Sequence, residues 1–136
     1  MDTSVLIAGL RSRNGASSVL LELISEQRVT PVATLPLFLE YEDVLKRAEQ
    51  RMALGHSLDD VDEILASLAS VIEPVDVYFR WRPQLRDPDD DMVLDAAING
   101  HADALVTHNV ADFGTVAERF GIALLRPAEL LKRMRS

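Results

Sequence analysis

The chain contains no cysteine among its 136 residues. That absence excludes a disulfide framework, a thiolate metal site and a cysteine nucleophile. Long apolar runs are also missing: the stretch from Val5 to Leu10 is too short for the core of a signal peptide, and Asp2 stands where basic residues would be needed. No segment approaches the roughly 20 apolar residues of a membrane span. We therefore expect a soluble, cytoplasmic protein with no membrane partner.

Positive charge is scarce, because 14 Lys and Arg side chains face 22 Asp and Glu side chains, for a formal charge of −8. Tight, sequence-independent binding of nucleic acid depends on basic groups that neutralise phosphates, so this balance argues against it. It does not exclude an enzyme acting on nucleic acid, since carboxylates that hold a metal ion are compensated once the metal is bound. Apolar residues make up 48% of the chain, which suits one domain over residues 1–136.

Helical and extended patterns alternate along the chain, which predicts an α/β domain with a mostly parallel sheet. Apolar spacing and capping residues predict helices over residues 17–26, 37–52, 57–71, 91–100, 110–120 and 127–135. Short apolar stretches predict strands over residues 28–34, 71–77, 103–107 and 122–125. In such a sheet, ligands bind beyond the carboxyl ends of the strands.

Acidic residues crowd in the stretch DPDDDMVLDAA, where Asp87, Asp89, Asp90 and Asp91 lie within five residues. Carboxylates this close repel one another and resist joint ionisation unless a positive charge lies among them. Helix capping, solvation and the binding of a cation each account for such a cluster. Capping and the helix dipole are the favoured explanation for Asp87 and Asp89.

Other oxygen-bearing side chains lie near predicted strand ends. Asp2 precedes the first apolar run, and Asn109 and Asp112 follow the strand that ends at Thr107. Glu40 borders the apolar face of a predicted helix, so its carboxylate either reaches solvent or is directed at a partner. A group of hard oxygen ligands without His or Cys suits Mg²⁺ or Mn²⁺. Such ions commonly activate water for phosphodiester hydrolysis.

Several segments resemble the PIN-domain family, in the order that the family shows. MDTSVLIAGL is similar to its opening Asp-Thr-Asn-Val-Leu signature, and LEYEDVLKR is similar to its Glu-Tyr helix. DPDDDMVLDAAINGHADALVTHNVADF is similar to its acidic helix start, Ala-rich helix, strand and Thr-x-(Asp/Asn)-x-x-Asp-Phe ending. The resemblance implies a three-layer α/β/α PIN-like fold with a mostly parallel sheet of four to five strands.

The same resemblance implies a function, since the family's members are largely metal-dependent ribonucleases. A Mg²⁺-dependent (or Mn²⁺-dependent) endoribonuclease is therefore expected. Many bacterial members are the toxins of toxin–antitoxin pairs, so the expected partners are an RNA substrate, an antitoxin protein and a second copy of the chain.

Carried over by position, the family's acids imply site residues in this chain. The implied catalytic residues are Asp2, Glu40, Asp90 and Asp112. Asp90 fits the third acid because it stands seven residues before Ala97, whereas counting back from Thr107 through a shorter loop selects Asp91. The implied metal ligands are Asp2, Asp90, Asp91 and Asp112. The implied supporting polar groups are Thr3, Ser4, Thr107 and Asn109.

Two positions depart from the family's pattern. Asn109 stands where many members have Asp, which leaves Asp112 as the charged candidate, and Ser4 stands where Asn is usual. A second hypothesis therefore remains open: a catalytically weak or inactive PIN-like module that binds RNA or a protein partner. A phosphatase or a nuclease acting on DNA is a weaker third hypothesis.

The loop RWRPQLR offers candidate contacts with RNA, because Arg82 and Arg86 could bind phosphate while Trp81 stacks on a base. Burial of Trp81, or its use at a protein interface, is slightly favoured over that role.

The start of the chain raises a separate question, because only Met1 precedes Asp2. In the family, the counterpart of Asp2 ends a buried central strand, and a sheet lacking that strand would leave its two neighbours with unpaired backbone groups. Either Val5 to Ala8 shift into the gap and carry Asp2 from the site, or the natural chain begins upstream. We expect the second.

Overall fold

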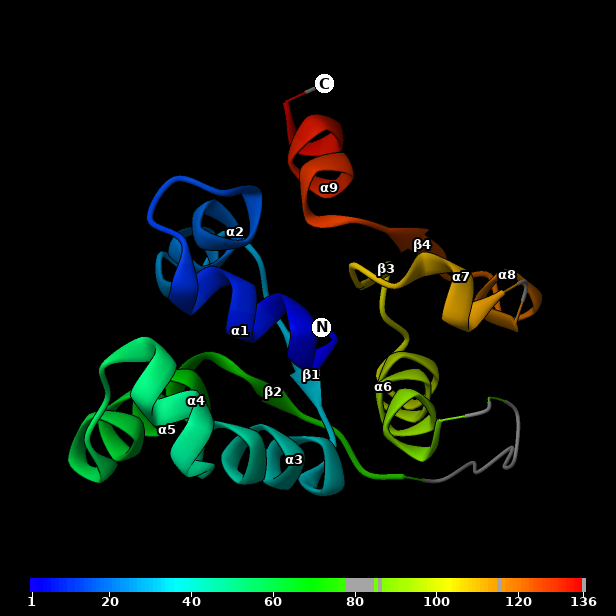
Figure 1. The fold of residues 1–136 in the computed structure, drawn as a ribbon. Helices are drawn as coiled ribbons and strands as arrows, with labels where there is room; N and C mark the ends of the chain where they lie inside the picture. The colour runs from blue at the N-terminus through cyan, green and yellow to red at the C-terminus, as the bar shows by residue number, and fades with distance from the viewer. Residues whose placement is uncertain (78–84, 86, 115, 136) are drawn as a thin grey trace.

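The computed structural model describes residues 1–77, 85, 87–114 and 116–135, in which helices and short strands alternate (Figure 1). The helices are α1 (Thr3–Arg11), α2 (Ala16–Ser25), α3 (Leu35–Lys46), α4 (Ala48–Leu54), α5 (Leu58–Val71), α6 (Pro88–Asn99), α7 (Val110–Phe113), α8 (Val116–Arg119) and α9 (Pro127–Met134). The strands are β1 (Val32–Ala33), β2 (Glu73–Pro74), β3 (Ala104–Val106) and β4 (Ala123–Leu125). The predicted α/β class is confirmed.

The strands form two separate parallel pairs in the described part of the chain, and the predicted sheet of four to five strands is not formed there. β1 pairs with β2, with Val32 opposite Glu73, and β3 pairs with β4, with Ala104 opposite Ala123. The first pair is short because α5 continues to Val71 and because proline has no N–H to donate to a ladder.

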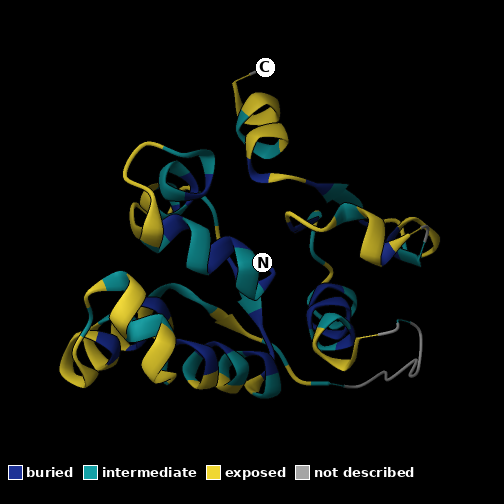
Figure 2. Ribbon diagram, viewed as in Figure 1, coloured by how far each residue is buried: buried dark blue, intermediate teal, exposed yellow. Residues whose placement is uncertain are grey.

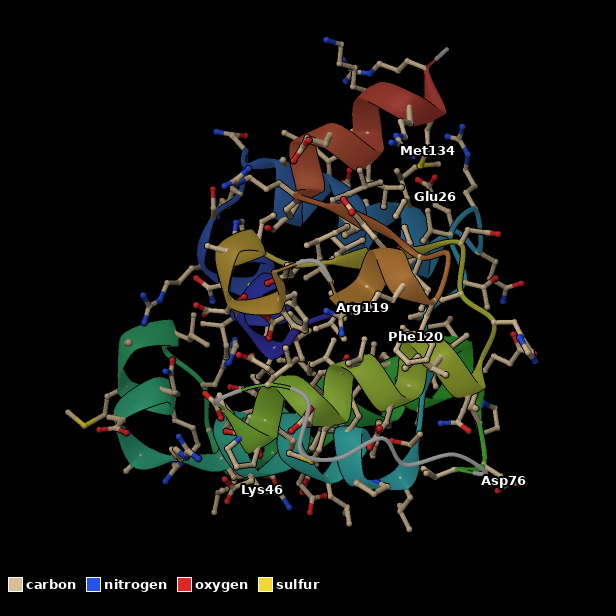
Figure 3. The ribbon with its side chains drawn as sticks, turned by 90° about the vertical axis from the view of Figure 1, so that its right-hand side faces the viewer. Glu26, Lys46, Asp76, Arg119, Phe120 and Met134 are labelled. Atoms are coloured by element: carbon tan, nitrogen blue, oxygen red, sulfur yellow. The ribbon has the colours of Figure 1, made fainter. Side chains whose placement is uncertain are left out.

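Buried residues of the helices lie beside β1 and β3, whereas both residues of β2 are exposed (Figure 2). α6 packs against α3, β1 and β3, and its residues Val93, Leu94, Ala96 and Ala97 are buried in the main core. Figure 3 shows α6 running between α3 on one side and α7 and α8 on the other. This packing brings the start of α6 close to the segment that follows β3.

The first two helices approach each other closely because Gly9 has no side chain. A Cβ atom at that position would lie 2.5 Å from Leu21 Cδ1 and 2.9 Å from the carbonyl oxygen of Ser17. Since Val5 to Ala8 lie within α1, they do not enter the sheet.

Two predicted helices are interrupted. The one over 37–52 divides at Arg47, whose ψ of 133° is not helical, into α3 and α4. α3 buries Leu37, Tyr41, Val44 and Leu45, whereas α4 buries no residue, so the chain leaves the core at this break. The predicted helix over 110–120 divides at Gly114, whose φ of 53° favours glycine.

The predicted helix starts are mostly correct. Thr34 caps α3, and Ser57 caps α5 in a reciprocal arrangement with Asp60. α6 begins at Pro88, three residues before the predicted start, because Asp87 is its N-cap. Within the described ranges, no helix combines the length and apolar character that a membrane crossing requires.

Candidate functional site

Asp2 lies beside the carboxyl end of β3. Its N–H donates a hydrogen bond to the carbonyl oxygen of Val106 at 2.9 Å. The chain then turns into α1, where the carboxylate of Asp2 caps the helix by accepting from the N–H of Ser4 at 3.5 Å. Asp2 is only 7% exposed. The short first segment therefore places this acid at the strand edge, as predicted.

Thr107 fixes the orientation of the Asp2 carboxylate. Its hydroxyl donates to Oδ2 of Asp2 at 2.5 Å and accepts from the N–H of Asn109 at 2.9 Å. Thr107 has no exposed surface, so water does not compete for these bonds. One buried hydroxyl thus connects the end of β3 to the first residues of the chain.

Tyr41 is a second residue that holds the start of the chain in place. The sequence did not single it out as a site residue. Its hydroxyl donates to the carbonyl oxygen of Met1, and its ring is buried in the main core. The available signal was its place on the apolar face of α3, next to Glu40. A buried tyrosine needs a partner for its hydroxyl, which predicts a polar contact without identifying it.

Asp90 lies where its charged form is disfavoured. Burial and the negative charges of Asp2, Asp87, Asp112 and Asp89 raise the pKa of its carboxyl group to about 6. Asp90 and Asp112 also line the same cleft, which has a volume of about 570 Å³. The structure therefore brings Asp2, Asp90 and Asp112 into one electrostatic group.

The other acids of the cluster have different surroundings. Asp87 accepts a hydrogen bond from the N–H of Asp89 at 2.9 Å, so the predicted capping role of Asp87 is confirmed. Asp89 is exposed in the first turn of α6. Asp91 is 4% exposed and is not among the described residues that line the cleft of Asp90 and Asp112.

Glu40 lies next to the start of α6. Burial raises the pKa of its carboxyl group, with further contributions from the negative charges of Asp89, Asp43 and Asp87, while Arg47 acts in the opposite direction. Asp89 and Asp87, which affect Glu40, also affect Asp90. Glu40 and Asp90 therefore share the acidic start of α6.

Thr3, Ser4 and Asn109 are the remaining predicted site residues that the structure describes. Thr3 is the first residue of α1, and Asn109 is exposed before α7, to which it gives no side-chain cap. The Oγ atom of Ser4 is buried and has no hydrogen-bond partner among the described residues. Arg82, Arg86 and Trp81 lie outside the described residues.

The chemistry of these groups fits a divalent cation, although the described side chains are not close enough together to bind one jointly. Among the described residues, no three His, Asp or Glu side chains lie close enough together to hold a metal ion. The available donors are hard carboxylate oxygens, the charged form of Asp90 is disfavoured by its neighbours, and a buried Ser4 hydroxyl stands two residues from Asp2. A cation would relieve the repulsion that keeps such carboxylates apart.

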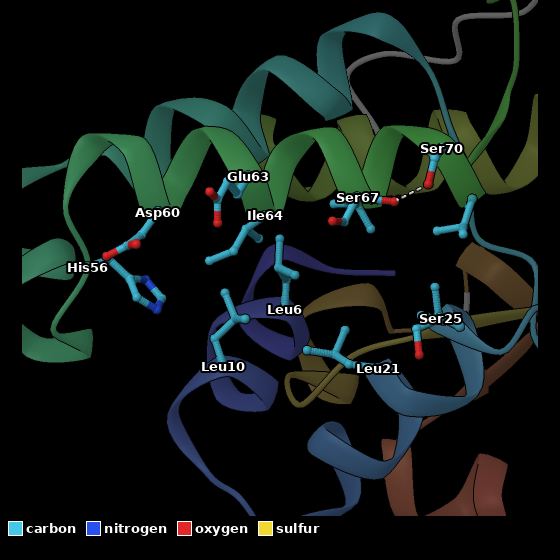
Figure 4. A pocket seen from close by; sticks show the side chains of 13 residues that line it. Leu6, Leu10, Leu21, Ser25, His56, Asp60, Glu63, Ile64, Ser67 and Ser70 are labelled. Carbon is cyan, nitrogen blue, oxygen red and sulfur yellow. Dashed lines mark hydrogen bonds between the residues drawn. The ribbon is translucent and has the colours of Figure 1, made fainter.

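Another cavity lies between α1, α2 and α5 (Figure 4). It has a volume of about 700 Å³, an apolar wall that includes Leu6, Leu10 and Leu21, and the acids Asp60 and Glu63 at α5. None of Asp2, Glu40, Asp90 and Asp112 lines it. This cavity is therefore larger than the acidic cleft but contains none of the predicted catalytic acids.

The raised pKa of Asp90 predicts a pH dependence of stability in the metal-free protein. The pKa is 3.8 for the ordinary group and about 6 in the folded state, so the folded state holds more protons between these values. The contribution of Asp90 to the free energy of unfolding must then fall as pH rises through this window and stay low above it. Urea unfolding in EDTA across the window checks this, with Asp90→Asn as the variant that lacks the titration. Equal slopes for both chains would contradict the assignment.

Comparison with known proteins gives a family but no individual relative. A family model described as PIN domain matches residues 1–111. No curated protein and no solved structure matches the chain. The matched range includes Asp2, Glu40 and Asp90 and ends one residue before Asp112.

Proposed function

Because this chain belongs to the PIN-domain family, whose members are generally metal-dependent nucleases, we propose that it is a Mg²⁺- or Mn²⁺-dependent endoribonuclease. The observation that carries the proposal is the shared cleft of Asp90 and Asp112, with the charge of Asp2 acting on Asp90. Asp2 lies next to the end of a parallel strand, and ligands of α/β folds bind beyond such strand ends.

In the proposed mechanism, Asp2, Asp90 and Asp112 would hold the cation, and Asp91 would be the alternative ligand at the third position. When bound, the cation supplies charge stabilisation for phosphodiester hydrolysis and lowers the pKa of water. Thr107 holds the Asp2 carboxylate in one orientation through its hydroxyl. Glu40, whose pKa is raised, exchanges a proton at the edge of the site. Arg82 and Arg86 are proposed to bind the RNA backbone.

The test is cleavage of end-labelled single-stranded RNA by the purified chain, with Mg²⁺ or Mn²⁺ titrated from zero. We expect internal fragments that appear only with metal and disappear with EDTA. Single-stranded DNA of the same sequence is the parallel substrate, and its preferential cleavage would contradict the RNA assignment. Absence of cleavage at every metal concentration would contradict the enzymatic proposal.

A second candidate is a PIN-like module that binds RNA or a partner without efficient catalysis. Two observations favour it: Asn109 contributes no charge, and no three potential metal ligands among the described residues lie together. RNA retained on the protein in EDTA, with no cleavage when metal is added, is the result that identifies this function.

We also propose that the enzyme is a cytoplasmic toxin whose partner is an antitoxin protein. Expression of the chain should then arrest growth of a bacterial host, and Asp90→Asn should restore it. Co-expression of a small neighbouring gene product that relieves the arrest would identify the antitoxin. If growth arrest persists in the Asp90→Asn variant, toxicity does not depend on the proposed site.

A homodimer is part of the same proposal. The exposed apolar residues Leu35 and Leu39 lie on α3, and Met52, on α4, is 84% exposed. Exposed apolar side chains of this size favour association when they gather on one surface. Light scattering at several concentrations measures the mass, and a monomer throughout would contradict this part.

Replacing Asn109 by Asp is expected to tighten metal binding. Divalent cations prefer charged oxygen ligands, and Asn109 follows the residue that orients Asp2, because its N–H donates to Thr107 Oγ1. We expect about tenfold stronger Mn²⁺ binding by calorimetry, with Asn99→Asp on α6 as a matched control. Unchanged or weaker binding would mean that Asp112 already fills this position.

A further inference from the structure

His108 lies between two residues of the candidate site, but its side chain contacts a different part of the molecule. Its neighbours in the chain are Thr107, which orients Asp2, and Asn109. Nε2 of His108 is hydrogen-bonded to Oγ of Ser17, in the first turn of α2, at 3.0 Å. In Figure 1 the segment between β3 and α7 bends toward α2. A single residue therefore connects the acidic site to the start of α2.

The two ends of this hydrogen bond differ in exposure. Ser17 is only 5% exposed, whereas His108 is an exposed residue. The other ring nitrogen of His108, Nδ1, has no hydrogen-bond partner among the described residues. When the hydroxyl of Ser17 donates to Nε2, the neutral ring carries its hydrogen on Nδ1. The buried hydroxyl can thus hold the ring in a state whose free N–H donates to a ligand from solvent.

Arg13 brings a positive charge to the same end of α2. Its carbonyl oxygen accepts a hydrogen bond from the hydroxyl of Ser18, also in the first turn of α2, at 3.3 Å. Arg13 is exposed, and its guanidinium forms no ion pair with a described residue. The first turn of α2 contains no acidic residue. Arg13 therefore leaves its charge open to an anion in solvent.

The acidic cleft by itself repels a polyanion. The carboxylates of Asp2, Asp87, Asp112 and Asp89 act on Asp90, and each of them disfavours its charged form. Proteins hold a nucleic-acid strand through basic side chains and N–H donors that contact its phosphates. Such groups are needed beside the cleft, because they can hold the backbone while the carboxylates are left to the metal ion.

We propose that His108 and Arg13 form a phosphate-binding edge that holds the RNA backbone beside the acidic cleft, and that Ser17 positions the imidazole of His108. Nδ1–H of His108 donates to a phosphate oxygen next to the cleft, and the guanidinium of Arg13 binds the backbone further toward the loop between α1 and α2. These contacts fix the position of the strand without reading its sequence. The inference takes its substrate from the proposed nuclease function, but it requires neither metal nor cleavage.

The test is the binding of labelled single-stranded RNA, measured by fluorescence anisotropy in EDTA so that no metal supports cleavage. We expect His108→Ala and Arg13→Ala each to weaken binding about three- to tenfold. Arg13→Ala should also reduce the slope of log K against log salt concentration by about 0.7, because one cationic contact with phosphate is lost. Arg28→Ala changes the net charge equally beyond the other end of α2, so this matched control should alter neither quantity.

Ser17→Ala tests the positioning role. We expect it to weaken RNA binding about two- to threefold in the parent chain and to have no effect in the His108→Ala chain, because Ser17 acts through the imidazole. Loss of a contact that served the fold alone would lower the thermal midpoint without this dependence on His108. If Ser17→Ala weakens binding equally in both chains, Ser17 does not position His108.

Equal RNA binding by the parent chain, His108→Ala and Arg13→Ala would overturn the phosphate-binding edge, as would a parent chain that does not bind RNA. Failure of the nuclease proposal gives a different result. If the parent chain binds RNA through both residues but never cleaves it with metal, the edge stands and the nuclease proposal is wrong. If the parent chain cleaves RNA and both variants bind it normally, the nuclease proposal stands and the edge is wrong.

Discussion

Replacement of Asp90 by Asn is expected to abolish metal-dependent RNA cleavage while making the metal-free protein more stable at pH 7. Asp90 shares its cleft with Asp112, and its charged form is disfavoured by burial and by the charges of Asp2, Asp87 and Asp112. The amide keeps the shape of the side chain but removes a charge that the cation requires. We expect cleavage to fall at least about a hundredfold.

The expected increase in stability is unusual, because most substitutions lower the free energy of unfolding. Loss of one like charge from the group relieves repulsion in the folded state, which raises the free energy of unfolding by about 1 kcal/mol after screening by solvent. Thermal unfolding in EDTA measures this change, and labelled RNA measures activity. Asp89→Asn is the matched control, because Asp89 is exposed on the same turn.

Two outcomes would contradict the assignment of Asp90. Full cleavage by Asp90→Asn at the same Mg²⁺ concentration would show that its carboxylate is not needed. Loss of cleavage in Asp91→Asn but not in Asp90→Asn would move the ligand by one residue. Since Asp91 is buried, its replacement should also be compared for thermal stability before its activity is interpreted.

Local signals predicted much of the fold. Thr34, Ser57 and Asp87 cap helices, and each satisfies backbone N–H groups through its own side chain, so the sequence alone contains the cause. The breaks at Arg47 and Gly114 were missed because the apolar pattern continues through them. What separates α3 from α4 is the end of burial, which depends on the rest of the molecule.

The sheet was predicted less well, for a different reason. Short apolar segments show where strands lie but not which edges meet, and pairing depends on residues far apart in the chain. β1 pairs with β2 and β3 pairs with β4, while the N–H of Asp2 donates to Val106 of β3.

The sequence predicted which types of residue form the candidate site, but it did not predict the directions in which their side chains point. Adjacent residues in a helix point about 100° apart, so Asp90 and Asp91 point in different directions, and the sequence left both open. The structure places Asp90 with Asp112 in the cleft and buries Asp91. The role of Thr107 in holding Asp2 likewise depends on a contact across 105 positions of sequence.

Replacement of Thr107 by Val is expected to have the largest effect on stability among the site variants. Valine has nearly the same shape but no hydroxyl, so Asp2 loses its donor at 2.5 Å and the N–H of Asn109 loses its acceptor at 2.9 Å. Thr107 is fully buried and Asp2 nearly so, so the loss of these hydrogen bonds is expected to cost about 1–3 kcal/mol.

The same change should reduce cleavage, because the Asp2 carboxylate becomes free to rotate away from the cation. Thr107→Ser keeps the hydroxyl and is the matched control, which should lose some packing but retain most activity. Urea unfolding and Mn²⁺ titration of the three chains separate the effects. If Thr107→Val unfolds earlier yet binds Mn²⁺ as tightly as Thr107→Ser does, then Thr107 supports the fold alone, and Asp2 does not depend on it for its position at the site.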